Sequence, residues 1–154
     1  MKLAVKENGL LDLAVGANGL LADDTLRTVV LVSLLTDRRA GPDDRLPDDT
    51  NATGLLPPDR RGWCGDALAE DADDRIGSRL WLLHREKQTP ETLRRAIHYC
   101  YEALQWLRDE GLVVTINVTA AWSQRGRLEV KIELTLPDGG TYAETFEIGG
   151  AYAV

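Results

Sequence analysis

Residues 128–136 constrain the fold most, because apolar and polar side chains alternate there without a break. Charged residues or Thr stand between the apolar ones. A period of two is typical of a β-strand with one dry face and one wet face. The segment therefore predicts an antiparallel sheet whose dry side other elements must cover. The apolar positions are Leu128, Val130, Ile132, Leu134 and Leu136.

Two further segments complete the predicted sheet. Residues 112–118 also alternate, and residues 142–148 follow a Pro-Asp-Gly-Gly turn at 137–140. Near the start of the chain, alternating residues within 2–21 flank Asn8-Gly9, a strong signal for a two-residue turn. We therefore expect an N-terminal β-hairpin and a main antiparallel sheet of three to four strands. The apolar residues of the first segment are Leu112, Val114, Ile116 and Val118.

About three helices are predicted to cover the sheet. The first spans Leu26–Thr36, follows the capping residues Asp23-Asp24-Thr25 and is apolar nearly all round. The second spans 76–87, where apolar residues recur at helical spacing after Ser78, a possible N-cap. The third begins at Thr89-Pro90 and ends at Gly111. Helices on one face of an antiparallel sheet define an α+β fold, here a single domain over residues 1–154.

Residues 37–74 form a long irregular loop rich in Pro and Asp. We expect a mobile tip around 43–53 and an ordered part around 57–68, which holds Arg60-Arg61-Gly62-Trp63-Cys64-Gly65-Asp66. Loops of this length are often functional, and Trp and Arg dominate binding energy at protein interfaces. Trp63 lies between small residues, so it either folds back on its own domain or inserts into a partner.

Bulk properties exclude several classes of protein. The net charge of −7 argues against a nucleic-acid partner, because affinity for nucleic acid comes largely from cations that neutralise phosphates. No apolar run is long enough to span a membrane. Cys64 and Cys100 form neither a disulfide framework nor a zinc motif. We expect synthesis in a cytoplasm and reduced thiols.

The sequence carries no strong catalytic or metal-binding motif. The acidic run at 70–74 lacks the spacing of a calcium loop, and His84 and His98 lack zinc-protease spacing. Cys64 could be a nucleophile if nearby cations lowered its pKa, but no partner His is evident. A pair of carboxylates for glycoside hydrolysis stays open among 25 acidic residues. We predict no cofactor, no metal and no catalytic residue, so a non-enzymatic protein is favoured.

Several blocks together resemble a known family. They are residues 23–26 leading into 30–40, the Arg60–Asp66 motif, and residues 74–83. These blocks, in one order along most of the chain, resemble the small baseplate-wedge proteins of Mu-like contractile-tailed phages and prophages. That family is similar to the sheath-initiator, or lysozyme-like, wedge proteins of other contractile machines. Their Glu-Pro-Arg signature is absent from the matching residues 107–112, so contacts assigned to it do not carry over.

The resemblance implies a virion structural protein of the tail baseplate, assembled in the host cytoplasm. Its partners would be other wedge and hub proteins and the tube and sheath subunits, with multiple copies in a ring. It also implies that sheath assembly starts by strand addition to an exposed sheet edge. The candidate edges are residues 128–136, residues 142–148 and the N-terminal hairpin.

The loop and its arginines form the candidate partner interface. Each arginine could instead pair with a carboxylate of its own domain, such as Asp37, Asp66 or Asp74. The alternative function is a phage-associated cell-wall glycoside hydrolase of the lysozyme type. The predicted interface residues are Arg38, Arg39, Arg60, Arg61, Trp63, Asp66, Arg75 and Arg79.

Overall fold

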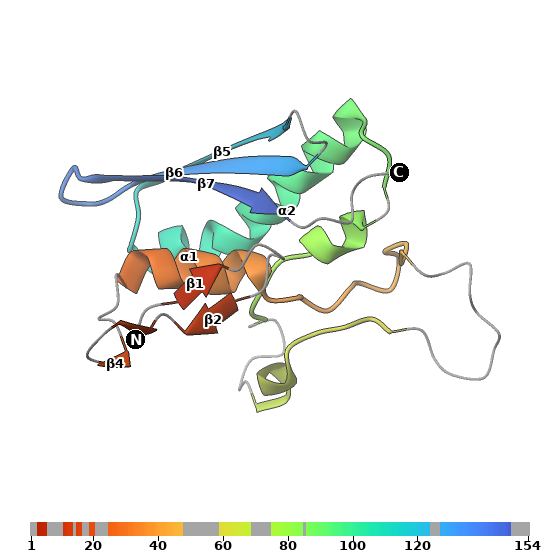
Figure 1. The fold of residues 1–154 in the computed structure, drawn as a ribbon, viewed down its shortest axis with the longest axis horizontal. Helices are drawn as coiled ribbons and strands as arrows, with labels where there is room; N and C mark the ends of the chain where they lie inside the picture. The colour runs from red at the N-terminus through yellow and green to blue at the C-terminus, as the bar shows by residue number, and fades with distance from the viewer. Residues whose placement is uncertain are drawn as a thin grey trace.

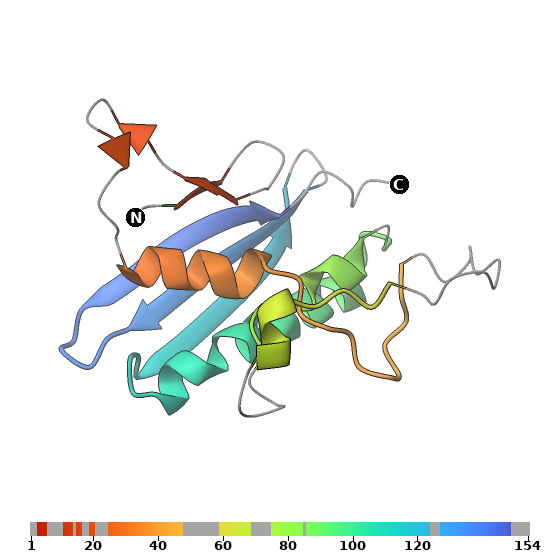
Figure 2. The same ribbon diagram turned by 90° about the horizontal axis from the view of Figure 1, so that it is seen from below.

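An antiparallel sheet of three strands covered on one face by two α-helices dominates the fold (Figure 1). In the computed structural model, strands β5 (Thr115–Trp122), β6 (Leu128–Thr135) and β7 (Thr141–Ile148) lie in the order β5-β6-β7. Helix α1 (Thr25–Leu35) lies beneath the sheet, and α2 (Pro90–Asp109) packs along β5, on the side away from β6 (Figure 2). The α+β class is confirmed. The structure describes residues 3–5, 11–13, 15–16, 19–20, 25–47, 59–68, 75–84, 86–123 and 127–148.

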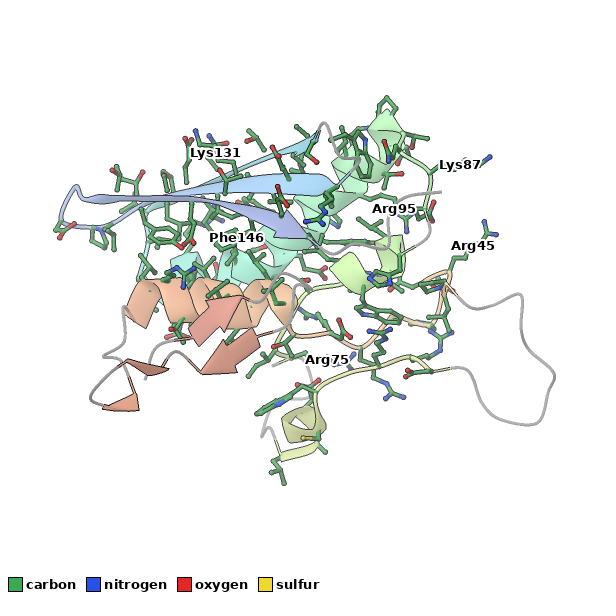
Figure 3. The ribbon with its side chains drawn as sticks, viewed as in Figure 1. Arg45, Arg75, Lys87, Arg95, Lys131 and Phe146 are labelled. Atoms are coloured by element: carbon green, nitrogen blue, oxygen red, sulfur yellow. The ribbon has the colours of Figure 1, made fainter. Side chains whose placement is uncertain are left out.

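The alternating pattern of β6 is confirmed in space. Its four inward side chains are at most 1% exposed, and they form the centre of the core beneath the sheet. Figure 3 shows Lys131 on the outer face of the sheet and Phe146 of β7 on the face toward the helices. The inward residues of β6 are Leu128, Val130, Ile132 and Leu134.

Helix α2 begins and ends as the sequence predicts. The side chain of Thr89 accepts a hydrogen bond from the Thr92 amide at 3.2 Å, and Pro90 occupies the first turn. Gly111 follows the helix with a φ of +71°, a backbone conformation that favours glycine. The buried stripe of α2 faces the core and includes Ala96, Cys100, Ala103, Leu104 and Leu107.

The predicted helix over residues 76–87 is wrong. The segment forms only a short 3₁₀ helix, η3 (Leu80–Leu83), and all four of its residues are buried. Gly77 has a φ of +104°, and Ser78 forms a parallel β-bridge with Asp37, so the chain is extended just before η3. The N-cap of η3 is Arg79 rather than Ser78. The Ser78 hydroxyl donates to the Leu34 carbonyl at 2.6 Å and accepts from the Leu80 amide at 3.3 Å, so it joins η3 to the end of α1. The described residues thus contain two α-helices rather than three.

The predicted start of the first strand of the main sheet, at Leu112, is also wrong. Leu112 and Val114 are 49% and 54% exposed, while Val113 between them is buried. The Val114 amide donates to the Thr135 carbonyl at 2.7 Å, one residue out of the β5–β6 register. The chain therefore changes phase between the end of α2 and the start of β5, and alternation counted from Leu112 fails.

Two small sheets lie near the N-terminus. Strand β1 (Leu3–Val5) pairs with β2 (Leu11–Leu13), and β3 (Val15–Gly16) pairs with β4 (Gly19–Leu20), both antiparallel. The proposed turn at Asn8-Gly9 lies outside the described residues, so the hairpin stays a prediction. The helix-capping residues Asp23 and Asp24 lie outside them as well.

The long loop is only partly described. Residues 37–47 run along the domain, where Leu46 is 6% exposed, so this part of the expected tip packs on the core. Residues 48–53 lie outside the described ranges. Residues 59–68 return along the same side and end in the 3₁₀ helix η2 (Cys64–Leu68). Among the described residues, no helix is both long enough and apolar enough to cross a lipid bilayer.

Candidate functional site

Three segments of the chain are joined by backbone hydrogen bonds and form the base of the candidate site. The Arg38 amide donates to the Ser78 carbonyl at 2.9 Å, and the Ser78 amide donates to the Thr36 carbonyl at 2.9 Å. The Ala40 amide donates to the Arg60 carbonyl at 3.1 Å. Residues 36–41 thus lie between residues 77–81 on one side and residues 59–62 on the other. We call residues 59–68 the Arg/Trp loop.

Gly77 explains why this base has its shape. A Cβ added to Gly77 would lie 2.4 Å from the Thr36 carbonyl oxygen, closer than any side chain tolerates. The residue also has a φ of +104°, where L-residues are strained. Glycine at this position lets the two backbones approach each other.

Arg60 and Arg61 attach the loop to this base. The Arg60 guanidinium donates to the carbonyl oxygens of Gly41 and Pro42, the latter at 3.1 Å. The Arg61 guanidinium pairs with Asp37 and lies 5.0 Å from the centre of the Trp81 ring. A cation over an aromatic face adds about 0.5–1 kcal/mol at an exposed site. Both arginines therefore bind their own domain.

Arg79 lies in the most enclosed ion-pair cluster of the region. Its guanidinium donates to Asp44 at 3.0 and 3.2 Å and to Glu102 of α2 at 3.0 Å. It also lies 4.9 Å from the centre of the Tyr99 ring. Burial alone would raise the pKa of Asp44, but hydrogen bonds from Arg79 and the Gly41 amide outweigh it and hold that pKa below its ordinary value of 3.8. Arg79 thus joins residues 41–44 to α2.

The tip of the Arg/Trp loop is exposed. The Trp63 ring lies directly against Gly65. A Cβ added to Gly65 would be 1.9 Å from a carbon of that ring, so only glycine fits there. The Trp63 side chain is nevertheless 47% exposed, and Leu68 is 87% exposed. No residue of η2 is buried. The ring therefore rests on its own loop and still presents one face outward.

The other predicted interface residues lie around this loop. Asp66 accepts a weak hydrogen bond from the Ile76 amide at 3.4 Å, which ties η2 to the segment before η3. Arg39 is exposed and lies against Gly62, whose φ is +120°. Arg38 and Arg75 line a groove of about 620 Å³ between α1, α2 and residues 75–77 (Figure 3 labels Arg75).

The structure therefore divides the predicted site in two. Arg60, Arg61 and Arg79 bind carboxylates or carbonyl groups of the domain, and Trp63 remains open at the tip. Sequence reasoning missed Asp44 and Trp81, the intramolecular partners of these arginines. No local signal could have found them, since they lie 20 to 35 positions from the arginines that they contact.

The described residues offer little for chemistry. Within them, no three His, Cys, Asp or Glu side chains come together as a metal site would require. Cys100 is buried, and desolvation raises the pKa of its thiol to about 12. Cys64 is an exposed thiol within η2.

Comparison with known proteins identifies the class to which this fold and loop belong, which is a class of phage proteins. The family model described as "Phage protein GP46" matches residues 26–141, from α1 to the start of β7. The chain belongs to this GP46 family. The match covers both α-helices, the whole Arg/Trp loop and most of the sheet.

Two relatives support this assignment over nearly their whole length. The chain is 49% identical over 140 residues to baseplate protein gp46 of Escherichia phage Mu, covering 91% of this chain and 90% of the relative. It is 37% identical over 139 residues to the Mu-like prophage FluMu protein gp46 of Haemophilus influenzae, covering 90% and 89%. The resemblance to baseplate proteins of Mu-like phages, stated from the sequence, is confirmed.

Proposed function

We propose that this protein is a non-enzymatic structural component of a contractile phage-tail baseplate. The single observation that supports this most is the end-to-end similarity to the Mu baseplate protein, at 49% identity. Because both chains are covered almost completely, the similarity concerns the whole domain. The protein acts in the virion, within the tail baseplate, after assembly in the host cytoplasm.

In this proposal the Arg/Trp loop contacts neighbouring hub, tube or wedge subunits. Support comes from its construction, with a base fixed by ion pairs and a tip that exposes Trp63 and Leu68. A preorganised loop loses little conformational entropy on binding, and Trp is a frequent hot-spot residue. Arg39 lies against Gly62 of the loop, and Arg38 and Arg75 line the groove between α1, α2 and residues 75–77. All three would add charge-assisted contacts. Asp66 would act indirectly, by holding η2.

The proposal also includes a wedge position with several copies in a ring, and initiation of the sheath by strand addition. Support for strand addition comes from the sheet, since β7 pairs with β6 alone among the described strands. Residues 128–136 are not an edge, because β6 lies between β5 and β7. The outer edge of β5 is not open either, because α2 packs along it (Figure 2). The accepting edge must therefore belong to β7 or to the N-terminal strands.

The test replaces the exposed tip and leaves the base intact. Trp63→Ala combined with Leu68→Ala removes most of the exposed apolar surface of the loop. A matched control, Arg94→Ala, removes an exposed side chain of α2 on another part of the surface. We expect both proteins to fold alike by circular dichroism, and only the loop variant to be missing from purified particles by mass spectrometry. Intact contractile tails that contain the loop variant at normal levels would contradict the role of the loop.

A further inference from the structure

The groove between α1, α2 and residues 75–77 has apolar walls that remain open to solvent. It has a volume of about 620 Å³. Val29 and Val32 of α1 line it and are only partly buried. Ile76 and Trp106 line it from two other segments and are 37% and 42% exposed. Apolar side chains from three segments thus meet on one open surface, which is typical of an interaction site.

Contacts within the domain fix the walls of this groove. The Trp106 Nε1 donates to the Ser33 hydroxyl at 3.2 Å, so the indole of α2 is held against α1. Arg79 pairs with Glu102 at 2.9 Å, which joins the segment after Gly77 to α2. The groove is therefore formed before a partner arrives, and binding there costs little conformational entropy of this domain.

The two ends of the groove carry opposite charges. Glu102 and Asp109 both line it, seven residues apart on α2, which is about 10 Å along the helix axis. Glu102 pairs with Arg79, which follows Ser78 in the chain. The Arg38 amide donates to the Ser78 carbonyl, so Arg38 lies toward the Glu102 end. Within the described residues, neither Arg38 nor Asp109 has an ion-pair partner.

We infer that this groove binds an amphipathic α-helix of a neighbouring tail subunit. The helix would place apolar side chains, spaced three or four residues apart, against the apolar walls. An acidic side chain would lie near Arg38 and a basic one near Asp109, about two helical turns apart. This inference rests on the proposed baseplate function and specifies the chemistry of one partner element.

The construction of the groove favours a helix over an extended segment. Two of its walls are the helices α1 and α2, which lie side by side (Figure 2) and whose backbone N–H and C=O groups bond within each helix. An extended segment laid between them would find no ladder of backbone partners, and its own polar groups would lose their water without replacement. A helix satisfies its backbone internally and presents only side chains.

A second copy of this protein fits the groove less well. The buried stripe of α2 faces the core of its own domain, and Val29 and Val32 of α1 already line the groove. Pairing two copies groove to groove would bring two hollow surfaces together and leave a void, whose lining would lose packing contacts. A convex helix from a different subunit fills the hollow.

The groove also adjoins the Arg/Trp loop. The Ile76 amide donates to the Asp66 side chain of η2 at 3.4 Å, so one wall of the groove lies next to the loop. Trp63 and Leu68 of the loop are exposed as well. A helix in the groove would therefore enlarge the interface that the proposed function assigns to the loop.

Two tryptophan substitutions on α2 test the groove. Gln105 is exposed and lines the groove, so Gln105→Trp places a bulky ring where the partner helix would lie. Arg94 is also exposed and lies eleven residues earlier, on the same face of α2 but about 16 Å away. We expect Gln105→Trp to lower the yield of contractile tails at least tenfold and Arg94→Trp to leave it within twofold of the parent, with both isolated proteins folded by circular dichroism. A normal yield from Gln105→Trp would contradict the inference.

A second pair of variants tests the charge at one end of the groove. Asp109 lines the groove and the adjacent Glu110 does not, although both are exposed. Asp109→Arg and Glu110→Arg make the same change of charge at neighbouring positions. We expect Asp109→Arg to lower the yield of tails at least fivefold and Glu110→Arg to change it less than twofold. Equal yields from the two variants would overturn the predicted charge pairing.

Electron cryo-microscopy of purified tails separates this inference from the proposed function. We expect the groove to hold a helix of another subunit, with an acidic residue at Arg38 and a basic residue at Asp109. Tails in which the protein is present but its groove is empty, or holds an extended segment or a second copy, would overturn the inference and leave the baseplate role standing. Tails that lack the protein would overturn both.

Discussion

Replacing Arg79 tests whether the arginines near the loop stabilise the domain or serve only a partner. Arg79 makes ion pairs with Asp44 at 3.0 Å and Glu102 at 2.9 Å. The three side chains are 21%, 18% and 30% exposed, so water screens this cluster less than it screens a surface pair. Arg79→Met keeps the apolar stem against Tyr99 and removes the charge.

The expected cost follows from the groups that the substitution leaves behind. Breaking a fully buried ion pair costs about 3–5 kcal/mol, because one charge remains uncompensated. Here two carboxylates lose their shared cation, but partial exposure lets water and counter-ions compensate some of the loss. We expect the free energy of unfolding to fall by about 2–4 kcal/mol at pH 7. In a domain of this size that corresponds to a melting temperature lower by roughly 4–16 °C.

Urea denaturation of the isolated protein, followed by circular dichroism, measures this loss. A double-mutant cycle with Glu102→Gln shows how much of it belongs to the Arg79–Glu102 pair. Arg79→Lys provides the conservative comparison, since a single ammonium cannot bridge both carboxylates with the planar fork of arginine. A change below about 0.5 kcal/mol for Arg79→Met would refute the reasoning, as it would equal that of an ordinary surface substitution. Arg79 would then act mainly on a partner.

Three further predictions follow from single contacts. Asp44→Asn should destabilise the protein at pH 7 but not near pH 2, and urea denaturation at several pH values tests this. Folding lowers the pKa of Asp44, so the ionised carboxylate stabilises the protein above pH 3.8, and this stabilisation is lost as the pH falls through the folded-state pKa. Gly65→Ala should displace the Trp63 ring, since the new Cβ would lie 1.9 Å from it, and the tryptophan emission spectrum should change with little loss of stability. Cys64 should react with iodoacetamide in the native protein while Cys100, buried and with a pKa of about 12, should react only after unfolding, which peptide mapping would show.

The elements that sequence predicts correctly are those whose signals are local and agree with one another. Strand β6 combines strict alternation with charged residues on its wet face, and α2 combines a cap, a proline and an apolar stripe. The helix predicted over 76–87 rested on spacing and on Ser78 as a possible N-cap. Gly77 and the bridge from Ser78 to Asp37 stop that helix, and the bridge joins residues 41 positions apart. Such a contact leaves no periodic trace in either segment.

In the candidate site too, local features could be predicted from the sequence, and contacts between distant residues could not. The sequence identifies the Arg/Trp loop, because Arg, Gly and Trp in a Pro-rich segment are typical of a shaped binding loop. It does not reveal which arginine has an acceptor within the domain, since Asp37 lies 24 positions from Arg61 and Asp44 lies 35 from Arg79. The position of Trp63 is intermediate between the two alternatives left open. Its ring rests on Gly65, and the residue as a whole is 47% exposed.

Because Arg61 is paired within the domain and Trp63 is partly exposed, substitutions at these two residues should affect stability and binding differently. Removing Arg61 breaks the pair with Asp37 and uncovers Trp81, so a failure of assembly would have two explanations. Replacing Trp63 with Ala breaks no side-chain hydrogen bond among the described residues and uncovers Gly65. If the loop binds a partner, the Trp63 variant must therefore lose assembly at unchanged stability, whereas the Arg61 variant should lose part of both. A loss of assembly that followed the loss of stability across the two variants would mean that the loop matters only as part of the fold.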